Sequence, residues 1–279
     1  MPAFPNFLVV GAMKAGTYSL HHYLHSHPQI EMSQKRKEVN FFVEELSWHR
    51  GTDWYRDFWI GNTPMRGESS TRYSMRDRYP GVPARIRSLL PEVRLVYAVR
   101  DPIARLMSQY VHDYDDNQEH RRFEDLLLAP DRQLTLSIGC YHYQLQRYLE
   151  CFPASAIRVV CFEDLIADAD RTLKPVLEFL GVDPEFGHSD WGAVHNDSGD
   201  KCRETPAGRV VRKLIGRRRL RRTPLLRKTL TRPIPTPVFD AQRHADIVGM
   251  YRADAERLET FTGRSFRHWT SLWPQPGTG

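Results

Sequence analysis

A short apolar run followed by a glycine loop and a helical pattern constrains the fold of this chain more than any other feature. Residues 7–10 (FLVV) lead directly into GAMKAGTYSL. A run of this length is typical of a buried strand, and the segment from Thr17 to Pro28 carries apolar residues at helical spacing. Glycines at 11 and 16 mark the turn between them. The sequence therefore predicts a strand–loop–helix unit at this end of the chain.

Two further apolar runs repeat this arrangement. Residues 94–100 (RLVYAVR) and 157–162 (IRVVCF) each precede a helical pattern, and the first helix has Asp101 as N-cap and Pro102 at its first position. Strands that alternate with helices predict a parallel sheet with helices on both faces. We therefore expect an α/β domain over about residues 1–190, with further helices at 82–90, 141–151, 172–180 and 240–262.

Composition narrows the class of protein only partly. With 279 residues, 41% hydrophobic and 27% charged, the chain is long enough for a substantial core. No apolar run approaches the ~20 residues of a bilayer-spanning helix, and we see no leader peptide. Four cysteines show neither a disulfide framework nor C-x-x-C spacing, so a cytoplasmic location is expected. The net charge of +6 indicates anionic partners without choosing between nucleotides, acidic sugars and nucleic acids.

The glycine loop has the spacing of a triphosphate-binding loop but not its lysine position. Lys14 lies inside the loop, and Thr17 follows Gly16 where a lysine is required for a triphosphate. Backbone N–H groups and the helix dipole at such a turn bind an anion of one or two charges. Thr17 and Ser19 add hydroxyl donors. A glycine turn with an incidental lysine remains the alternative for this loop alone.

Two further strings carry candidate chemistry. In RDPIARLMSQY, Arg100 ends a strand where open α/β sheets bind ligands, and Ser108 lies two turns into the next helix. Together they would hold a second phosphate, although Arg100 alone could equally pair with a carboxylate. In KEVNFF, Glu38 precedes two aromatic residues, which suits a carboxylate to accepting a proton. A surface glutamate is the alternative.

Together these three strings resemble the 3′-phosphoadenylyl sulfate (PAPS)-dependent sulfotransferases. The resemblance is strongest to the branch of heparan-sulfate and other carbohydrate sulfotransferases and their bacterial relatives. G-E-x-x-x-x-Y (Gly67, Glu68 and Tyr73) and L-x-x-x-T-G-x-x-x-x-x-W (Leu258 to Trp269) extend it nearly end to end. It implies a P-loop-like three-layer α/β fold with a central parallel sheet, in a single domain whose residues 191–279 form a basic, mainly helical extension over the cofactor and acceptor side.

The resemblance also implies a reaction and a set of site residues. PAPS is the expected donor, adenosine 3′,5′-bisphosphate the product, and no metal is expected. The acceptor group is a hydroxyl, in preference to an amine, of a carbohydrate, lipid or secondary metabolite. Lys14 and Glu38 are the expected catalytic residues, with Glu68 as the reserve base. The expected donor-binding residues are Ala15, Gly16, Thr17, Tyr18, Ser19, Arg100, Ser108, Lys201, Arg203, Gly208 and Arg209. The expected acceptor-binding residues are Lys37, Asn40, Glu68 and Tyr73.

Departures from the branch concern the acceptor. The 3-O-sulfating members have a histidine two residues after the base and an aspartate five residues after it, where this chain has Asn40 and Val43. Ser69 stands where a lysine often follows the motif glutamate. These departures count against heparan-type acceptor chemistry and leave donor binding unaffected. The acceptor is expected to contact the variable segments 44–63 and 113–122 and the C-terminal third.

Two other features invite different functions. His21 and His25 have metal-ligand spacing, but no partnering pattern follows, so no metal site is predicted there. Residues 209–232 contain eleven Lys or Arg among 24 residues, which is compatible with a non-catalytic polyanion- or nucleic-acid-binding protein. Few aromatic residues lie there, so no nucleic-acid partner is expected, and apolar positions predict helices docked on the body: Val210, Leu214, Leu220 and Leu225. A nucleotide kinase is the remaining rival, and the oligomeric state is open.

Overall fold

The computed structural model describes the chain except for residues 1–3, 117–118, 192–201, 216–222, 235–236 and 275–279. Its centre is a five-stranded sheet in the order β2-β3-β1-β4-β5, in which all neighbouring strands are parallel. The strands are β1 (Phe7–Gly11), β2 (Ile30–Met32), β3 (Met65–Ser69), β4 (Arg94–Val99) and β5 (Ile157–Cys161). This confirms the α/β class and the three strands predicted from apolar runs.

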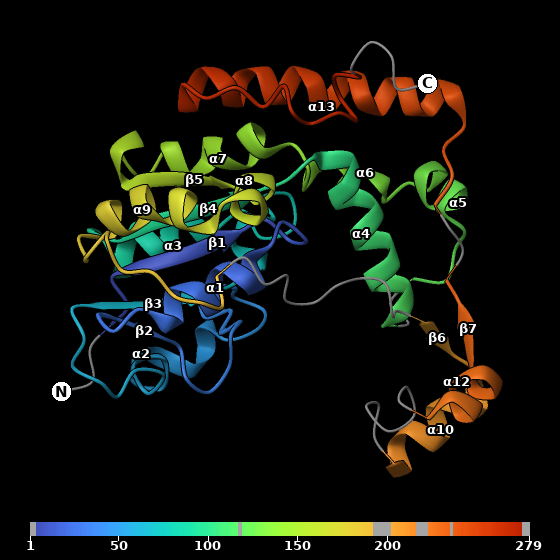
Figure 1. The fold of residues 1–279 in the computed structure, drawn as a ribbon, viewed down its shortest axis with the longest axis horizontal. Coiled ribbons are helices and arrows are strands. Elements are labelled where there is room, and N and C mark those ends of the chain that lie inside the picture. The colour runs from blue at the N-terminus through green and yellow to red at the C-terminus, as the bar shows by residue number, and fades with distance from the viewer. Residues whose placement is uncertain (1–3, 117–118, 192–201, 216–222, 235–236, 275–279) are drawn as a thin grey trace.

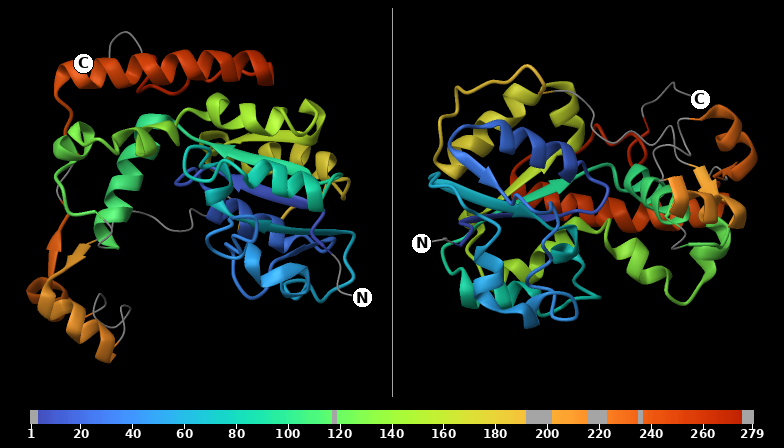
Figure 2. Two further views of the ribbon diagram at one scale, coloured as in Figure 1. Left: turned by 180° about the vertical axis from the view of Figure 1, so that it is seen from behind. Right: turned by 90° about the horizontal axis from the view of Figure 1, so that it is seen from below.

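Helices cover both faces of the sheet. The view from below in Figure 2 shows α1 (Thr17–Ser26) and α9 (Ala169–Leu180) on one face, with α3 (Val82–Leu89) and α7 (Tyr141–Leu149) on the other. Because both faces are covered, the strands are buried along nearly their whole length and their sequences read as continuous apolar runs. The remaining helices of this part are α2 (Gly51–Arg56), α4 (Pro102–Asp115), α5 (Phe123–Leu128), α6 (Arg132–Ser137) and α8 (Phe162–Ala167), with short 3₁₀ turns η1 (Trp48–Arg50), η2 (Thr71–Ser74) and η3 (Ala154–Ala156).

The helix that follows β4 begins as its sequence predicts. The Asp101 carboxylate accepts hydrogen bonds from the backbone N–H groups of Ile103 (3.0 Å) and Ala104 (3.1 Å), and Pro102 occupies the first helical position. This N-cap satisfies donors that the first turn leaves without helical partners. The cap fixes the direction in which α4 leaves the edge of the sheet.

The long helix α13 (Ala241–Thr262) packs across α7, as Figure 1 shows. Its buried Asp254 accepts hydrogen bonds from the backbone N–H groups of His142 (2.9 Å) and Tyr143 (3.0 Å), in the first turn of α7. Burial raises the pKa of Asp254, and these N–H donors oppose that effect. The C-terminal part is thus joined to the α/β core through a buried polar contact as well as through apolar packing.

The basic segment differs from its prediction. The hairpin of β6 (Cys202–Glu204) and β7 (Thr231–Pro233) is antiparallel, and it carries α10 (Pro206–Ile215) and α12 (Pro224–Leu230). Figure 1 shows this unit beyond the lower end of α4. Val210 and Leu214 are 62% and 79% exposed, so the predicted docking of these side chains on the body is wrong. Leu220 and the Leu225 side chain lie outside what the structure describes.

In the part of the chain that the structure describes, no helix combines the length and the apolar character needed to cross a bilayer.

Candidate active site

The carboxyl ends of the central strands open onto one cavity of about 420 Å³. Its lining comes from the loop after β1, the segment after β2, the η2 turn with the residues that follow it, the helices α4 and α6, and the start of α8. Parallel sheets of this type bind ligands at this edge, because the loops that follow the strands converge there. Nine of the residues predicted from the sequence line the cavity: Lys14, Gly16, Thr17, Tyr18, Ser19, Lys37, Glu38, Arg100 and Ser108.

The glycine loop (residues 11–19) has a backbone that only glycine fits at its turn into α1. Gly16 has φ 79°, and a Cβ atom there would lie 2.2 Å from Cδ2 of Phe162. No side chain caps the start of α1, and its first turn contains no acidic residue. The first N–H groups of the helix are therefore arranged to receive an anion from the cavity.

Two arginines join the glycine loop to the segment after β4. Arg100 Nη1 donates to the Lys14 carbonyl oxygen (3.4 Å), and its guanidinium lies 4.8 Å from the ring centroid of Phe162. Arg105 is fully buried, and its Nη1 donates to Gln109 Oε1 at 2.8 Å and to the Met13 carbonyl at 3.5 Å. Arg100 thus lines the cavity, whereas Arg105 holds the loop from behind.

Glu38 lies among hydrogen-bond donors and cations. The Thr71 hydroxyl donates to Oε1 at 3.1 Å, Lys37 Nζ lies 3.6 Å from Oε1, and Arg72 Nη1 lies 3.6 Å from Oε2. Lys37 Nζ also donates to Thr17 Oγ1 (3.2 Å), and burial lowers the pKa of this lysine. Lys37 Nζ therefore lies between Thr17 of the glycine loop and the Glu38 carboxylate.

The first histidine of the α1 pair is enclosed by protein. Burial, reinforced by the charge of Lys37, lowers the pKa of His21 to about 3, so the ring is neutral. Its Nδ1 lies 3.0 Å from Ser69 Oγ, whereas His25 is exposed. The two rings therefore differ in environment despite their spacing.

Three predicted acceptor-binding residues lie behind the cavity wall. Glu68 is fully buried and accepts hydrogen bonds from the hydroxyls of Tyr55 (2.7 Å), Tyr73 (2.7 Å) and Ser70 (2.6 Å). Burial raises the pKa of Glu68, and these donors partly offset the effect. Asn40 is buried at φ 55°, and its N–H donates to Ser70 Oγ (3.0 Å). Glu68, Tyr73 and Asn40 are absent from the cavity lining, and their contacts support the segment that carries Glu38.

Some predicted donor-binding residues are placed elsewhere or lie outside the description. Ala15 is buried and does not line the cavity. Gly208 packs in α10, where a Cβ atom would lie 2.3 Å from the Leu230 carbonyl oxygen. Lys201 lies outside the described residues, as do the side chains of Arg203 and Arg209. Among the residues that the structure describes, the cavity lining ends at Phe162.

The cavity also contains residues that sequence reasoning missed. Arg72 lies inside the G-E-x-x-x-x-Y string, which could have drawn attention to it. His112 continues the face of α4 that carries Ser108. Asp113 lines the cavity at the start of the predicted acceptor segment 113–122, whereas no residue of the predicted segment 44–63, which the structure describes throughout, does so. Burial raises the pKa of Asp113 to about 6. Phe162 had no signal beyond its place at the end of a predicted strand. Helical spacing from Ser108 was therefore the strongest unused signal.

Comparisons with known proteins indicate one family. The family model described as "Sulfotransferase domain" matches residues 4–205. The bifunctional heparan sulfate N-deacetylase/N-sulfotransferase 2 of Homo sapiens is 27% identical over 241 residues, which cover 79% of this chain and 26% of that protein. The heparan sulfate glucosamine 3-O-sulfotransferase 3A1 of Mus musculus is 29% identical over 188 residues, which cover 64% and 46%. The chain thus spans between a quarter and a half of these relatives.

A solved structure shares the fold. The sulfotransferase from Alicyclobacillus acidocaldarius superimposes with a TM-score of 0.69 at 23% sequence identity, covering 96% of this chain and 99% of that one. At this identity the likeness concerns the fold alone.

Proposed function

This chain belongs to the sulfotransferase domain family, and we propose that its sulfuryl transfer runs from PAPS to a hydroxyl, in preference to an amine, of a carbohydrate, lipid or secondary-metabolite acceptor. One observation carries the proposal. Lys14, Glu38, Arg100 and Ser108 come from four separate segments, and all of them line one cavity. The same cavity therefore contains two positions for anions and a candidate base.

The donor half of the cavity fits PAPS in its charges. The start of α1, with Lys14 and Thr17, offers N–H, ammonium and hydroxyl donors to a 5′-phosphosulfate. Arg100 and Ser108 offer a second position, suited to a 3′-phosphate. A nucleotide kinase would need a lysine directly after Gly16, and that residue is Thr17. The charge pattern thus favours two separated anionic groups over a triphosphate.

The half of the cavity that would bind the sulfuryl acceptor also contains the candidate base. Glu38 would take the proton from the acceptor hydroxyl, while Thr71 and Lys37 hold its carboxylate in place. Bound PAPS supplies the sulfuryl group, which forms a bond to the acceptor oxygen as its bond to the 5′-phosphate breaks. Lys14 and the N–H groups of α1 would stabilise the negative charge on the departing bisphosphate. Glu68 would act by supporting the Glu38 segment rather than as a base.

The acceptor side of the cavity favours a polar acceptor. Beyond the donor positions, its lining includes Arg72, Arg78, Asp77, His112 and Asp113. Side chains of both signs suit a hydroxyl-rich molecule, and the curated relatives are named for heparan sulfate. Among the three acceptor classes we therefore favour a carbohydrate. Heparan-type contacts are not expected, because Asn40 and Val43 stand where the 3-O-sulfating members have a histidine and an aspartate.

The proposal is tested by product release. The purified chain is incubated with PAPS and a panel of sugars, glycolipids and phenols, and release of adenosine 3′,5′-bisphosphate is followed by chromatography. We expect release that depends on one acceptor class and is lost in Lys14→Ala. The rival polyanion-binding function predicts that Lys14→Ala changes nothing and that deletion of residues 217–222 abolishes function; that result would contradict the proposal.

A further inference from the structure

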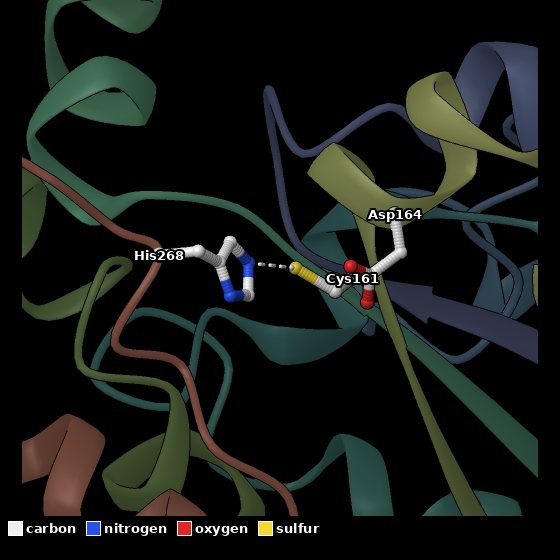
Figure 3. Close-up of side chains that lie close together, drawn as sticks. All are labelled: Cys161, Asp164 and His268. Atoms are coloured by element: carbon white, nitrogen blue, oxygen red, sulfur yellow. Dashed lines mark hydrogen bonds between the residues drawn. The ribbon is translucent and has the colours of Figure 1, made fainter.

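We propose that Cys161, Asp164 and His268 bind a thiophilic divalent cation, with Zn²⁺ as the physiological candidate, at a site separate from the cavity (Figure 3). None of the three residues lines that cavity. Cys161 is the last residue of β5, Asp164 lies in α8, and His268 belongs to the segment that follows α13. The site therefore joins two parts of the chain that are 107 residues apart between Cys161 and His268.

The positions of the ligand atoms suit a single ion. Cys161 Sγ and His268 Nε2 are 3.4 Å apart, and one ligand atom from each of the three residues lies within 4.8 Å of the others. Tetrahedral zinc with bonds of about 2.3 Å to sulfur and about 2.0 Å to nitrogen separates these two atoms by roughly 3.5 Å. The thiol and imidazole are therefore already spaced as two ligands of one ion.

The types of ligand decide which cation fits. Sulfur, imidazole nitrogen and carboxylate oxygen together are the ligand set of zinc and its transition-metal neighbours, whereas magnesium and calcium prefer oxygen alone. Zinc in proteins takes four ligands, and His268 is exposed on the solvent side. A water molecule would complete the tetrahedron from that side.

Neighbouring residues hold the ligands in place. Arg264 forms an ion pair with one carboxylate oxygen of Asp164. Glu163, whose Oε2 lies 3.1 Å from Cys161 Sγ, accepts hydrogen bonds from Trp269 Nε1 (3.1 Å) and from the Asp101 N–H (2.9 Å). The Cys161 thiol donates to Glu163 Oε2, and an ion would displace this hydrogen bond together with the thiol proton. The outer partner of the site is therefore Arg264, through its ion pair with Asp164. Such outer partners orient ligands and stabilise metal sites.

The segment that carries His268 is itself fixed by packing. Phe266 and Trp269 are fully buried and stack with ring centroids 4.5 Å apart. Ser271 Oγ donates to Asp101 Oδ1 at 2.5 Å. Because the backbone is fixed on both sides of His268, the ion would meet a largely preformed site and little ordering of the chain would oppose binding.

A cation would also balance the negative charges around Cys161. Cys161 is fully buried beside two carboxylates, with its Sγ 3.1 Å from Glu163 Oε2 and within 4.8 Å of an Asp164 oxygen. A divalent ion would displace the thiol proton and balance the resulting thiolate and the Asp164 carboxylate. Arg264, which is paired with Asp164, adds one further positive charge. The ion and Arg264 together would balance the thiolate and the carboxylates of Asp164 and Glu163.

The expected role is structural. Phe162, directly after Cys161, packs against Gly16 in the glycine loop, and Glu163 holds the N–H of Asp101 next to Arg100. An ion at Cys161 would therefore brace the wall behind the cavity and fasten the C-terminal segment to it. This role does not depend on the donor or acceptor proposed above.

Cobalt titration of the chelator-treated full chain tests the site. We expect one equivalent of Co²⁺ to bind, with a thiolate-to-metal absorption band in the near ultraviolet and the visible bands of a tetrahedral ion. Cys161→Ser should lose the near-ultraviolet band, and His268→Ala should weaken binding at least ~10-fold to 100-fold. Two matched controls should keep the band: Cys151→Ser, at a half-buried cysteine elsewhere, and His25→Ala, at an exposed histidine of α1.

A second experiment measures thermal stability with and without Zn²⁺, so that the proposal can still be tested if a variant folds poorly. Zn²⁺ should raise the melting temperature of the wild type and of Cys151→Ser, and leave that of His268→Ala nearly unchanged, with circular dichroism confirming the fold of each. His268 is exposed, so its replacement leaves the packed core intact. Absence of a thiolate band in the wild type, its persistence in Cys161→Ser, or equal zinc stabilisation of His268→Ala would each overturn the proposal.

Discussion

The proposed donor half and the proposed acceptor half of the cavity are built by different means. The donor half depends on backbone geometry, namely the φ of 79° at Gly16 and the uncapped start of α1. The acceptor half depends on side chains from separate segments, such as Glu38 and Arg72, which meet only in the folded chain. Backbone geometry leaves a fixed spacing in the sequence, whereas convergence of side chains does not. This difference explains why the family can be predicted from the sequence, whereas the identity of the acceptor cannot.

The largest effect is expected for Glu38→Gln, which should lower turnover without changing donor binding. Glu38→Gln keeps the shape of the side chain but removes its ability to take a proton, so we expect kcat to fall by about 10²–10⁴-fold. Affinity for adenosine 3′,5′-bisphosphate should be unchanged, as measured by calorimetry. Glu44→Gln is the control, because Glu44 forms an ion pair with Arg85 and lies outside the cavity lining. Equal losses in the two variants would contradict the assignment of Glu38.

A second variant tests the backbone half. Gly16→Ala places a Cβ atom 2.2 Å from the Phe162 ring, and overpacking of this kind costs about 1–3 kcal/mol. We expect roughly a tenfold to hundredfold loss in affinity for the bisphosphate. Gly51→Ala is a matched control, since Gly51 has the same φ of 79° with nothing within 4 Å of the added atom. If both variants bind the bisphosphate like the wild type, the loop does not hold the donor.

A third variant sharpens the acceptor half. Arg72→Ala removes a partly exposed ion pair with Glu38, and pairs of this kind contribute about 0.2–1 kcal/mol. We expect kcat/KM for the acceptor to fall up to about fivefold while donor KM stays constant. The comparison is with Arg56→Ala, which removes the exposed pair to Asp53. A change in donor KM would contradict the assignment of Arg72 to the acceptor half.

The last prediction concerns the pH dependence of folding stability rather than catalysis or binding. Burial raises the pKa of Asp113 to about 6 from 3.8, so the folded state binds more protons than the unfolded state between these values. The stability contribution of this group is present below about pH 4 and is lost as the pH rises through 6. Linkage with these two pKa values allows up to ~3 kcal/mol. Because the side chain is partly exposed and screened by solvent, we expect Asp113→Asn to gain about 1 kcal/mol relative to wild type between pH 4 and 7. Urea unfolding at both pH values measures the shift, and the exposed Asp53→Asn should show none.

The sequence predicted those parts of the fold whose signal is local. The runs of β1, β4 and β5 are continuous because both faces of the sheet are covered, and the Asp101 cap lies beside the helix that it starts. In contrast, β3 has the sequence MRGES, and Glu68 is tolerated there only because Tyr55 and Tyr73 donate to it from other segments. The G-E-x-x-x-x-Y string relates Glu68 to Tyr73, but no local pattern indicates that both Tyr55 and Tyr73 donate to this carboxylate.

The same distinction applies to the candidate site. Nine predicted residues line the cavity because motif spacing fixes loops at the edge of the sheet. Glu68 and Asn40 belong to the same motifs, but in the folded chain they lie in the wall behind Glu38 and not in the cavity lining. The role of Phe162 follows from its contact with Gly16, which is far away in the sequence. Roles of individual residues in donor and acceptor binding stay predictions.

Calorimetric titration of adenosine 3′,5′-bisphosphate tests the central claim most directly, because the claim requires two anion positions in one cavity. Wild type, Lys14→Ala and Arg100→Ala are compared, with ATP and Mg²⁺ as a control ligand. The account predicts micromolar binding of the bisphosphate that weakens sharply in Arg100→Ala, with no preference for ATP. Absence of bisphosphate binding, or tight magnesium-dependent binding of ATP, would contradict it.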